Sequence, residues 1–114
     1  MKTAHFLRFD AKSSQDLSSG PLDFTTSFGR KFKLEQVMVH ASQAISELIT
    51  ITLVSKHGPD YNLVIRKHDM DHEQDFLHRP DGQCNFQDGD EINVQCTNAN
   101  EIGEVFLQIK TSEM

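Results

Sequence analysis

A chain of 114 residues with 37% hydrophobic residues has room for one domain around one modest core. Its 17 acidic residues outnumber its 11 basic ones and give a formal net charge of −6, which argues against a nucleic-acid partner. No apolar run approaches the roughly 20 residues needed to cross a bilayer, and the first residues alternate instead of forming a secretory signal. We therefore expect a cytoplasmic protein with no membrane partner.

Residues 1–30 have the composition of an arm rather than of a core segment. A short alternating run at residues 5–9 predicts an edge strand at most, and the Ser-, Asp- and Gly-Pro-containing residues 10–21 are typical of a loop. Such an arm either reaches a neighbouring subunit or frays as an ordinary terminus. We divide the chain accordingly into an N-terminal arm, residues 1–30, and a β-sandwich domain, residues 31–114.

The sandwich is predicted to begin with two strands. Residues 32–40 alternate with one slip of phase, which indicates a β-bulge or a bend. Residues 41–44 are small and polar and predict a connection. Residues 48–54 give the clearest strand, with Ile49, Ile51 and Leu53 on one face. A helix over residues 40–54 is the alternative, and the β-branched run at residues 49–51 argues against it.

Turns and short strands continue to the C-terminus. A turn at residues 57–60 precedes a predicted strand at 61–65, where Tyr61, Leu63 and Ile65 share a face. Residues 66–75 are charged and predict a solvated acidic loop, followed by a short strand at 76–77. Turns at 79–82 and at Asp88-Gly89 then separate strands at 92–96 and 105–110. About six to eight short strands of this kind predict an all-β antiparallel sandwich or barrel.

Six histidines raise the question of a metal site. His68, Asp71 and His72 are weak candidates, because a zinc or manganese site uses these residue types. The segment is polar on both sides, however, and offers no apolar shell to hold ligands rigid. The carboxylate pairs Asp69/Asp71 and Asp88/Asp90 suit calcium, although solvated turn residues are the simpler interpretation. We therefore predict no metal and no other cofactor.

Nucleophilic and phosphate-binding motifs are also missing from the pattern. The serines cluster in the predicted arm, where nothing positions a base, and the six glycines are isolated turn residues. Cys84 and Cys96 are too few for a disulfide framework, and we interpret them as buried thiols, or as a pair if their strands are neighbours. We predict no catalytic residues and no enzymatic activity.

A family resemblance rests on the order of these patterns. It runs from residues 31–37 through residues 47–53 and Tyr61 to the motif Phe86-x-x-Gly89-Asp90-x-Ile92-x-Val94 and a final Phe106-Leu107-Gln108-Ile109. Over roughly residues 30–110 the chain resembles small virion proteins of tailed bacteriophages. The resemblance implies a jelly-roll-like sandwich that decorates or cements a capsid as a homo-oligomer, often a trimer. Its partner would be the major capsid protein or another virion protein, and its location the virion, after assembly in the host cytoplasm.

Two other functions remain as alternatives. One is a ligand-binding sandwich for carbohydrate or metal, although eight Phe, one Tyr and no Trp make a poor sugar platform, since we expect phenylalanine mainly in the core. The other is a small cupin-like metal enzyme, which usually carries His-x-His on a strand, and this motif does not occur here. The open sheet edges of a sandwich must be guarded or used, which favours the assembly function.

Overall fold

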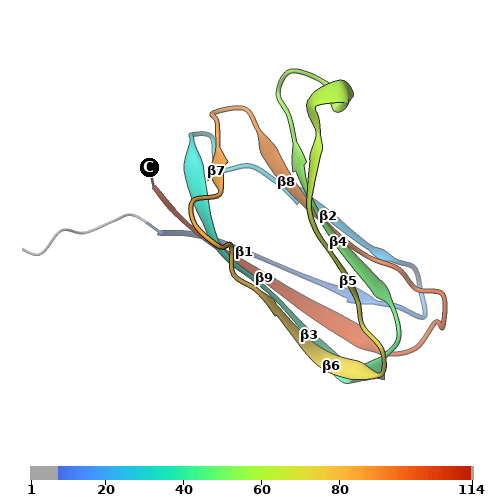
Figure 1. Ribbon diagram of the computed structural model, residues 1–114. Coiled ribbons are helices and arrows are strands. Elements are labelled where there is room, and N and C mark those ends of the chain that lie inside the picture. Colours follow the sequence, from blue (N-terminus) through green and yellow to red (C-terminus); the bar gives the residue numbers. More distant parts are fainter. Residues whose placement is uncertain (1–7, 114) are drawn as a thin grey trace, which may run out of the picture.

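The computed structural model describes residues 8–113, which form two antiparallel sheets packed face to face (Figure 1). Sheet A contains, in spatial order, β1 (Arg8–Asp16), β9 (Glu104–Glu113), β3 (Phe32–Ile45) and β6 (Glu73–His78), with β7 (Asn85–Phe86) also pairing with β3. Sheet B contains β2 (Leu22–Thr26), β8 (Glu91–Cys96), β4 (Leu48–Val54) and β5 (Leu63–Asp69). A single 3₁₀ turn, Pro59–Tyr61, lies between β4 and β5 among these residues.

The strand pairing is that of a jelly roll. β1 pairs with β9, β2 with β8, β3 with β6 and β4 with β5, so the chain runs as one long antiparallel ribbon folded over to make two sheets. Two interleaved Greek keys of this kind define the jelly-roll architecture. The predicted all-β, jelly-roll-like antiparallel sandwich is thereby confirmed, with nine strands in the described residues instead of six to eight.

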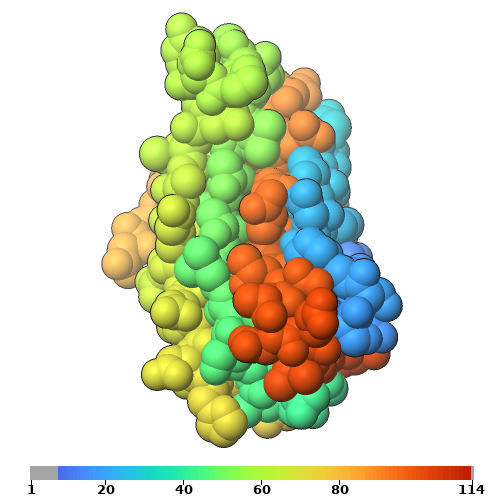
Figure 2. All heavy atoms as spheres, turned by 90° about the vertical axis from the view of Figure 1, so that its right-hand side faces the viewer, coloured from blue at the N-terminus to red at the C-terminus, as the bar shows by residue number. Residues whose placement is uncertain are grey.

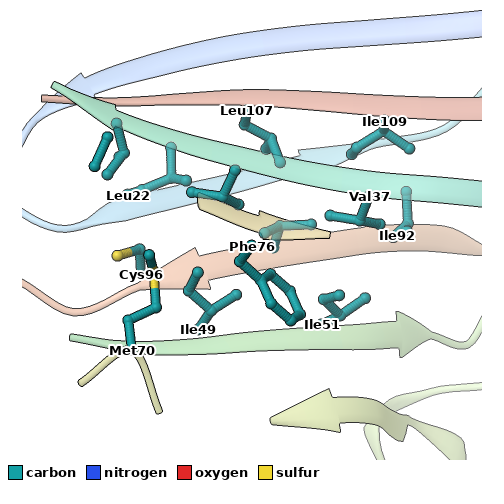
Figure 3. Close-up of a cluster of buried hydrophobic side chains, with 14 of the residues drawn as sticks. Leu22, Val37, Ile49, Ile51, Met70, Phe76, Ile92, Cys96, Leu107 and Ile109 are labelled. Atoms are coloured by element: carbon teal, nitrogen blue, oxygen red, sulfur yellow. The ribbon is translucent and has the colours of Figure 1, made fainter. Parts of the chain in front are cut away.

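Alternating side chains of both sheets fill the space between them (Figure 3). β9 contributes Val105, Leu107 and Ile109, as its alternation predicts, and β4 contributes Ile49 and Ile51. All five are fully or almost fully buried. The hydrophobic effect on these inward faces holds the two sheets together.

The predicted irregularity in the first sandwich strand is confirmed, but the strand is longer than expected. The register between β3 and β9 shifts between Leu34 and Gln36, as a β-bulge does. Residues 41–44, predicted to be a connection, continue β3 as far as Ile45. Ala41 is buried and pairs with Val105 of β9. This pairing with a distant strand extends β3 through residues whose local composition predicts a connection.

The N-terminal segment is part of the sandwich. β1 pairs with β9 along its whole length and β2 pairs with β8, so residues 8–16 and 22–26 form edge strands of the two sheets. The expected loop at residues 10–21 and the division into an arm, residues 1–30, and a separate sandwich are therefore wrong for the described part of this segment. An edge strand exposes one face and one side, which explains its polar composition. Residues 5–7 of the predicted edge strand lie outside the described residues.

The acidic segment at residues 66–75 is mostly strand rather than loop, and it crosses from sheet B to sheet A. Its ends belong to β5 and β6, and residues 70–72 connect them. Met70 is completely buried in that connection and anchors it to the core. Tyr61 lies in the 3₁₀ turn instead of in a strand. The pattern was misleading because β5 and β6 are both edge strands with much of their surface in solvent.

Candidate interaction surface

The outer face of sheet A carries apolar side chains on three neighbouring strands. The register sets Met38 of β3 opposite Leu77 of β6, and His40 of β3 opposite Phe106 of β9. These four residues, which we call the sheet A patch, point away from the core. Phe106 is 44% exposed and Leu77 is 49% exposed.

Polar groups surround the sheet A patch. The Nδ1 atom of His40 lies 2.6 Å from the Oδ1 atom of Asp75, and the His40 ring faces that of Phe106 with centroids 6.3 Å apart. On the side of β1, Lys12 and Ser14 line a shallow depression together with Met38, His40 and Phe106. The surface is thus open and nearly flat, with an apolar centre and a polar rim. Protein-binding surfaces have this composition.

The centre of the outer face of sheet B differs in chemistry. Figure 2 shows this face, with β5, β4, β8 and β2 side by side from left to right. Asn93 lies between Thr25 and Thr52, and its Nδ2 atom donates to Asp23 Oδ1 at 2.7 Å and to Thr25 Oγ1 at 2.8 Å. These polar groups satisfy one another within the chain. Sheet B also exposes apolar side chains, namely Leu48 on β4 and Leu63 and Val64 on its edge strand β5. In sheet A, the half-exposed aromatic ring of Phe106 lies on the inner strand β9.

The sheet A patch was not predicted from the sequence, because phenylalanine was assigned to the core. A signal for it existed. Val105, Leu107 and Ile109 alternate toward the core, and Phe106 stands between them, so the same period that buries its neighbours turns Phe106 outward. The corresponding argument applies to Leu77, which follows the buried Phe76 in β6.

The candidate metal ligands are not brought together. His68 lies on β5, where its ring stacks on that of Phe76 at 4.4 Å and its Nε2 atom is 3.2 Å from Glu73 Oε1. Asp71 and His72 are exposed in the connection, and the backbone N–H of His72 donates to Ser46 Oγ at 3.0 Å. Residues 8–113 contain no group of three His, Cys, Asp or Glu side chains arranged to hold a metal ion.

Two titratable groups on β6 have shifted pKa values. The backbone N–H of Asp71 donates to Glu73 Oε1, and this bond, with the one from His68, lowers the pKa of Glu73. Burial lowers the pKa of His78, and the nearby guanidinium of Arg66 adds to the effect. The Glu73 carboxyl group therefore favours its ionised form, and the His78 imidazole favours its neutral form.

The calcium interpretation of Asp88 and Asp90 gives way to a structural one. Asp90 is 5% exposed, and its carboxylate accepts the backbone N–H of Lys56 at 2.9 Å and of Gln87 at 2.9 Å. Asp88 is exposed in the predicted turn. The Asp90 carboxylate therefore links the β4–β5 and β7–β8 connections by hydrogen bonds, which is a structural role.

Both cysteines are free thiols in the described chain. Cys96 is buried, and desolvation together with the Glu47 carboxylate raises its pKa to about 11. Cys84 is half-buried, and desolvation raises its pKa as well. A thiol needs a lowered pKa to react as a nucleophile near neutral pH. Neither cysteine has the electrostatic setting of a catalytic nucleophile.

Comparison with known proteins assigns the chain to no family. No family model matches the chain, and a search of curated proteins finds no match. Among solved structures, the core of Drosophila NLP, described in connection with pentamer formation and histone binding, is 15% identical with a TM-score of 0.46, over 89% of this chain and 95% of that one. PirA is 12% identical with a TM-score of 0.44, over 97% and 96% of the two chains. At these TM-scores neither likeness bears on what this chain does.

Proposed function

We propose that the protein is a structural protein that binds another protein's surface through the sheet A patch, and that this surface is a bacteriophage capsid which it decorates as a homo-oligomer. The single observation that carries the proposal is the group of apolar side chains on neighbouring strands of the outer face of sheet A. Phe106 and Leu77 remain half-exposed on adjacent rows of one sheet. An apolar patch rimmed by polar groups is typical of interaction sites.

The sheet A patch has the composition of an interface centre. Aromatic residues and methionine are enriched there, and the patch contributes Phe106 and Met38. Completing the burial of Phe106 and Leu77 would contribute roughly 1 kcal/mol each, since full burial of such a side chain contributes about 1.5–3 kcal/mol. The His40–Asp75 pair at the edge supplies orientation rather than affinity, because both side chains are largely exposed.

A binding free energy of this size is sufficient when the partner surface repeats the same site many times. One small patch gives weak binding, and many identical sites on a capsid raise the total through avidity once the subunits are linked. The net charge of −6 favours a partner with a positive or neutral surface. The resemblance to virion accessory proteins supports the same choice.

The experiment compares two substitutions of equal chemistry. Leu77→Asp changes the sheet A patch, where Leu77 is 49% exposed, whereas Leu63→Asp changes a leucine on edge strand β5 that is 61% exposed. The assay is co-sedimentation with capsid particles of the bacteriophage that, on this proposal, encodes the protein. We expect Leu77→Asp to abolish binding and Leu63→Asp to retain it. Equal binding by both variants, or no binding by the wild type, would refute the proposal.

A further inference from the structure

Strand β1 is a long and regular edge strand of sheet A. It is nine residues long, against five in β2, seven in β5 and six in β6, which are the other outer strands of the two sheets. Its pairing with β9 runs from Arg8 to Asp16 without a register shift. β5, by contrast, contains an irregularity opposite Ile51 and Thr52, and Pro21 directly precedes β2.

An edge of this kind is a template for another strand. Within residues 8–113, β1 is paired with β9 on one side only. Natural proteins guard long edges with bulges, prolines or charges, since unpaired backbone N–H and C=O groups recruit other chains. β1 has neither a bulge nor a proline, so its charges decide which strand it accepts.

Those charges are self-complementary. The side chains on the outer face of β1 are exposed and alternate in sign from Arg8 to Asp10 to Lys12. Suppose that β1 pairs antiparallel with β1 of a second copy about Ala11. Asp10 of each copy then lies opposite Lys12 of the other, and Arg8 lies opposite Ser14. Opposite charges in directly opposed positions stabilise a sheet, and the small Ala11 occupies the axis.

Other registers of the β1–β1 pair bring like charges into opposition or shorten the overlap. Centring on Asp10 or on Lys12 sets those like charges directly against each other, and centring on Ser13 opposes Asp10 to Asp16. Centring on Ser14 pairs Lys12 with Asp16, but only residues 12–16 then overlap. The Asp16 carboxylate, moreover, already accepts the backbone N–H of Ser18 at 3.0 Å and its hydroxyl at 2.7 Å.

We propose that the protein forms a two-fold homodimer by antiparallel pairing of β1 with β1 of a second copy, centred on Ala11. The two sheets A then join into one continuous sheet, and main-chain hydrogen bonds supply the affinity. A two-fold axis perpendicular to the sheet brings both sheet A patches to the same side of the dimer. The dimer replaces the trimer that the family resemblance implies. The inference uses an edge rather than the sheet A patch, so it stands independently of the proposed function.

Charge swapping tests the register. Sedimentation velocity measures dimerisation of the wild type, Asp10→Lys, Lys12→Asp and the double variant Asp10→Lys/Lys12→Asp, with Asp81→Lys in the exposed 79–82 turn as the control for charge. Each single variant should raise the dimer Kd by about tenfold or more, because two opposed pairs change from unlike to like charge. The double variant should restore the wild-type Kd, and Asp81→Lys should leave it unchanged.

Cross-linking tests the axis. Directly opposed residues of an antiparallel pair have Cα atoms about 4.5–5.5 Å apart, a distance that a disulfide spans. Ala11→Cys should therefore give a covalent dimer under mild oxidation, whereas Ser13→Cys and the wild type should not. A monomeric or trimeric wild type, a double variant that stays dissociated, or equal cross-linking at positions 11 and 13 would overturn the proposal. Leu77→Asp should remain dimeric, which separates failure of this inference from failure of capsid binding.

Discussion

Glu47→Gln is expected to destabilise the protein although it changes one atom. Glu47 is 2% exposed in the connection between β3 and β4. Its Oε1 atom accepts hydrogen bonds from Thr97 Oγ1 at 2.7 Å and from the N–H of Ala99 at 2.9 Å, and its Oε2 atom accepts the N–H of Asn100 at 2.9 Å. Glutamine keeps one acceptor oxygen, but its NH₂ group is a donor. This NH₂ group faces at least one of the donors that Glu47 accepts, so that donor loses its hydrogen bond. A buried donor left without a partner costs about 1–3 kcal/mol, so we expect a loss of about 2–3 kcal/mol.

The stabilisation that the Glu47 carboxylate provides is expected to depend on pH. Burial raises the pKa of Glu47, but the hydrogen bonds from Asn100, Thr97 and Ala99 outweigh it and hold the pKa below its ordinary value of 4.5. A carboxyl whose pKa is lower in the folded state stabilises the fold above the unfolded-state pKa. That contribution is lost as the pH falls through the folded-state pKa.

Urea denaturation near neutral pH and again at about pH 3 measures both effects. The difference in unfolding free energy between the wild type and Glu47→Gln should be large near neutral pH and should shrink in acid. Glu104→Gln, at an exposed position on β9, is the matched control and should be neutral. A near-neutral effect of Glu47→Gln, or a difference that persists unchanged in acid, would refute the reasoning.

Three further predictions concern the core and the candidate sites. Phe86→Ala should cost about 3–5 kcal/mol in urea denaturation because Phe86 is completely buried, whereas Phe106→Ala should cost less than about 1 kcal/mol; equal costs would contradict the assigned burial. Cys96 should react slowly with a thiol reagent at mildly alkaline pH until the protein unfolds, since its pKa is raised to about 11, and rapid reaction of the native protein would count against this. Zinc should leave the melting temperature unchanged, because no three His, Cys, Asp or Glu side chains in residues 8–113 are arranged to hold a metal ion. A clear increase in melting temperature would support the metal-site interpretation of His68 and His72.

The strands that the sequence predicts well are those with one buried face. β4 and β9 alternate between apolar and polar side chains because one side packs on the core and the other meets solvent. The slip of phase in β3 is visible for the same reason, since a bulge shifts the period by one residue.

The strands that the sequence hides are the edges. β1, β5 and β6 are rich in polar residues, and their conformation comes from partners far along the chain, as in the pairing of Arg8 with Ser112. Local composition carries no information about such a partner. The histidine-rich segment at residues 66–75 reads as a loop from its sequence for this reason, although most of it belongs to β5 and β6.

The sheet A patch was accessible to sequence reasoning in principle. Phe106 lies out of phase with three buried neighbours, and this observation alone turns it toward solvent. Its neighbours His40 and Leu77 depend on the register of β3 with β9 and β6, which only the structure supplies.

The central claim is that the outer face of sheet A meets the partner. A cryo-electron microscopy reconstruction of capsids decorated with this protein tests it most directly. The account predicts that Phe106, Leu77 and Met38 are buried against the capsid, with sheet B turned toward solvent. A reconstruction in which sheet B, or the connections at either end of the sandwich, lies on the capsid and Phe106 remains in solvent would contradict it.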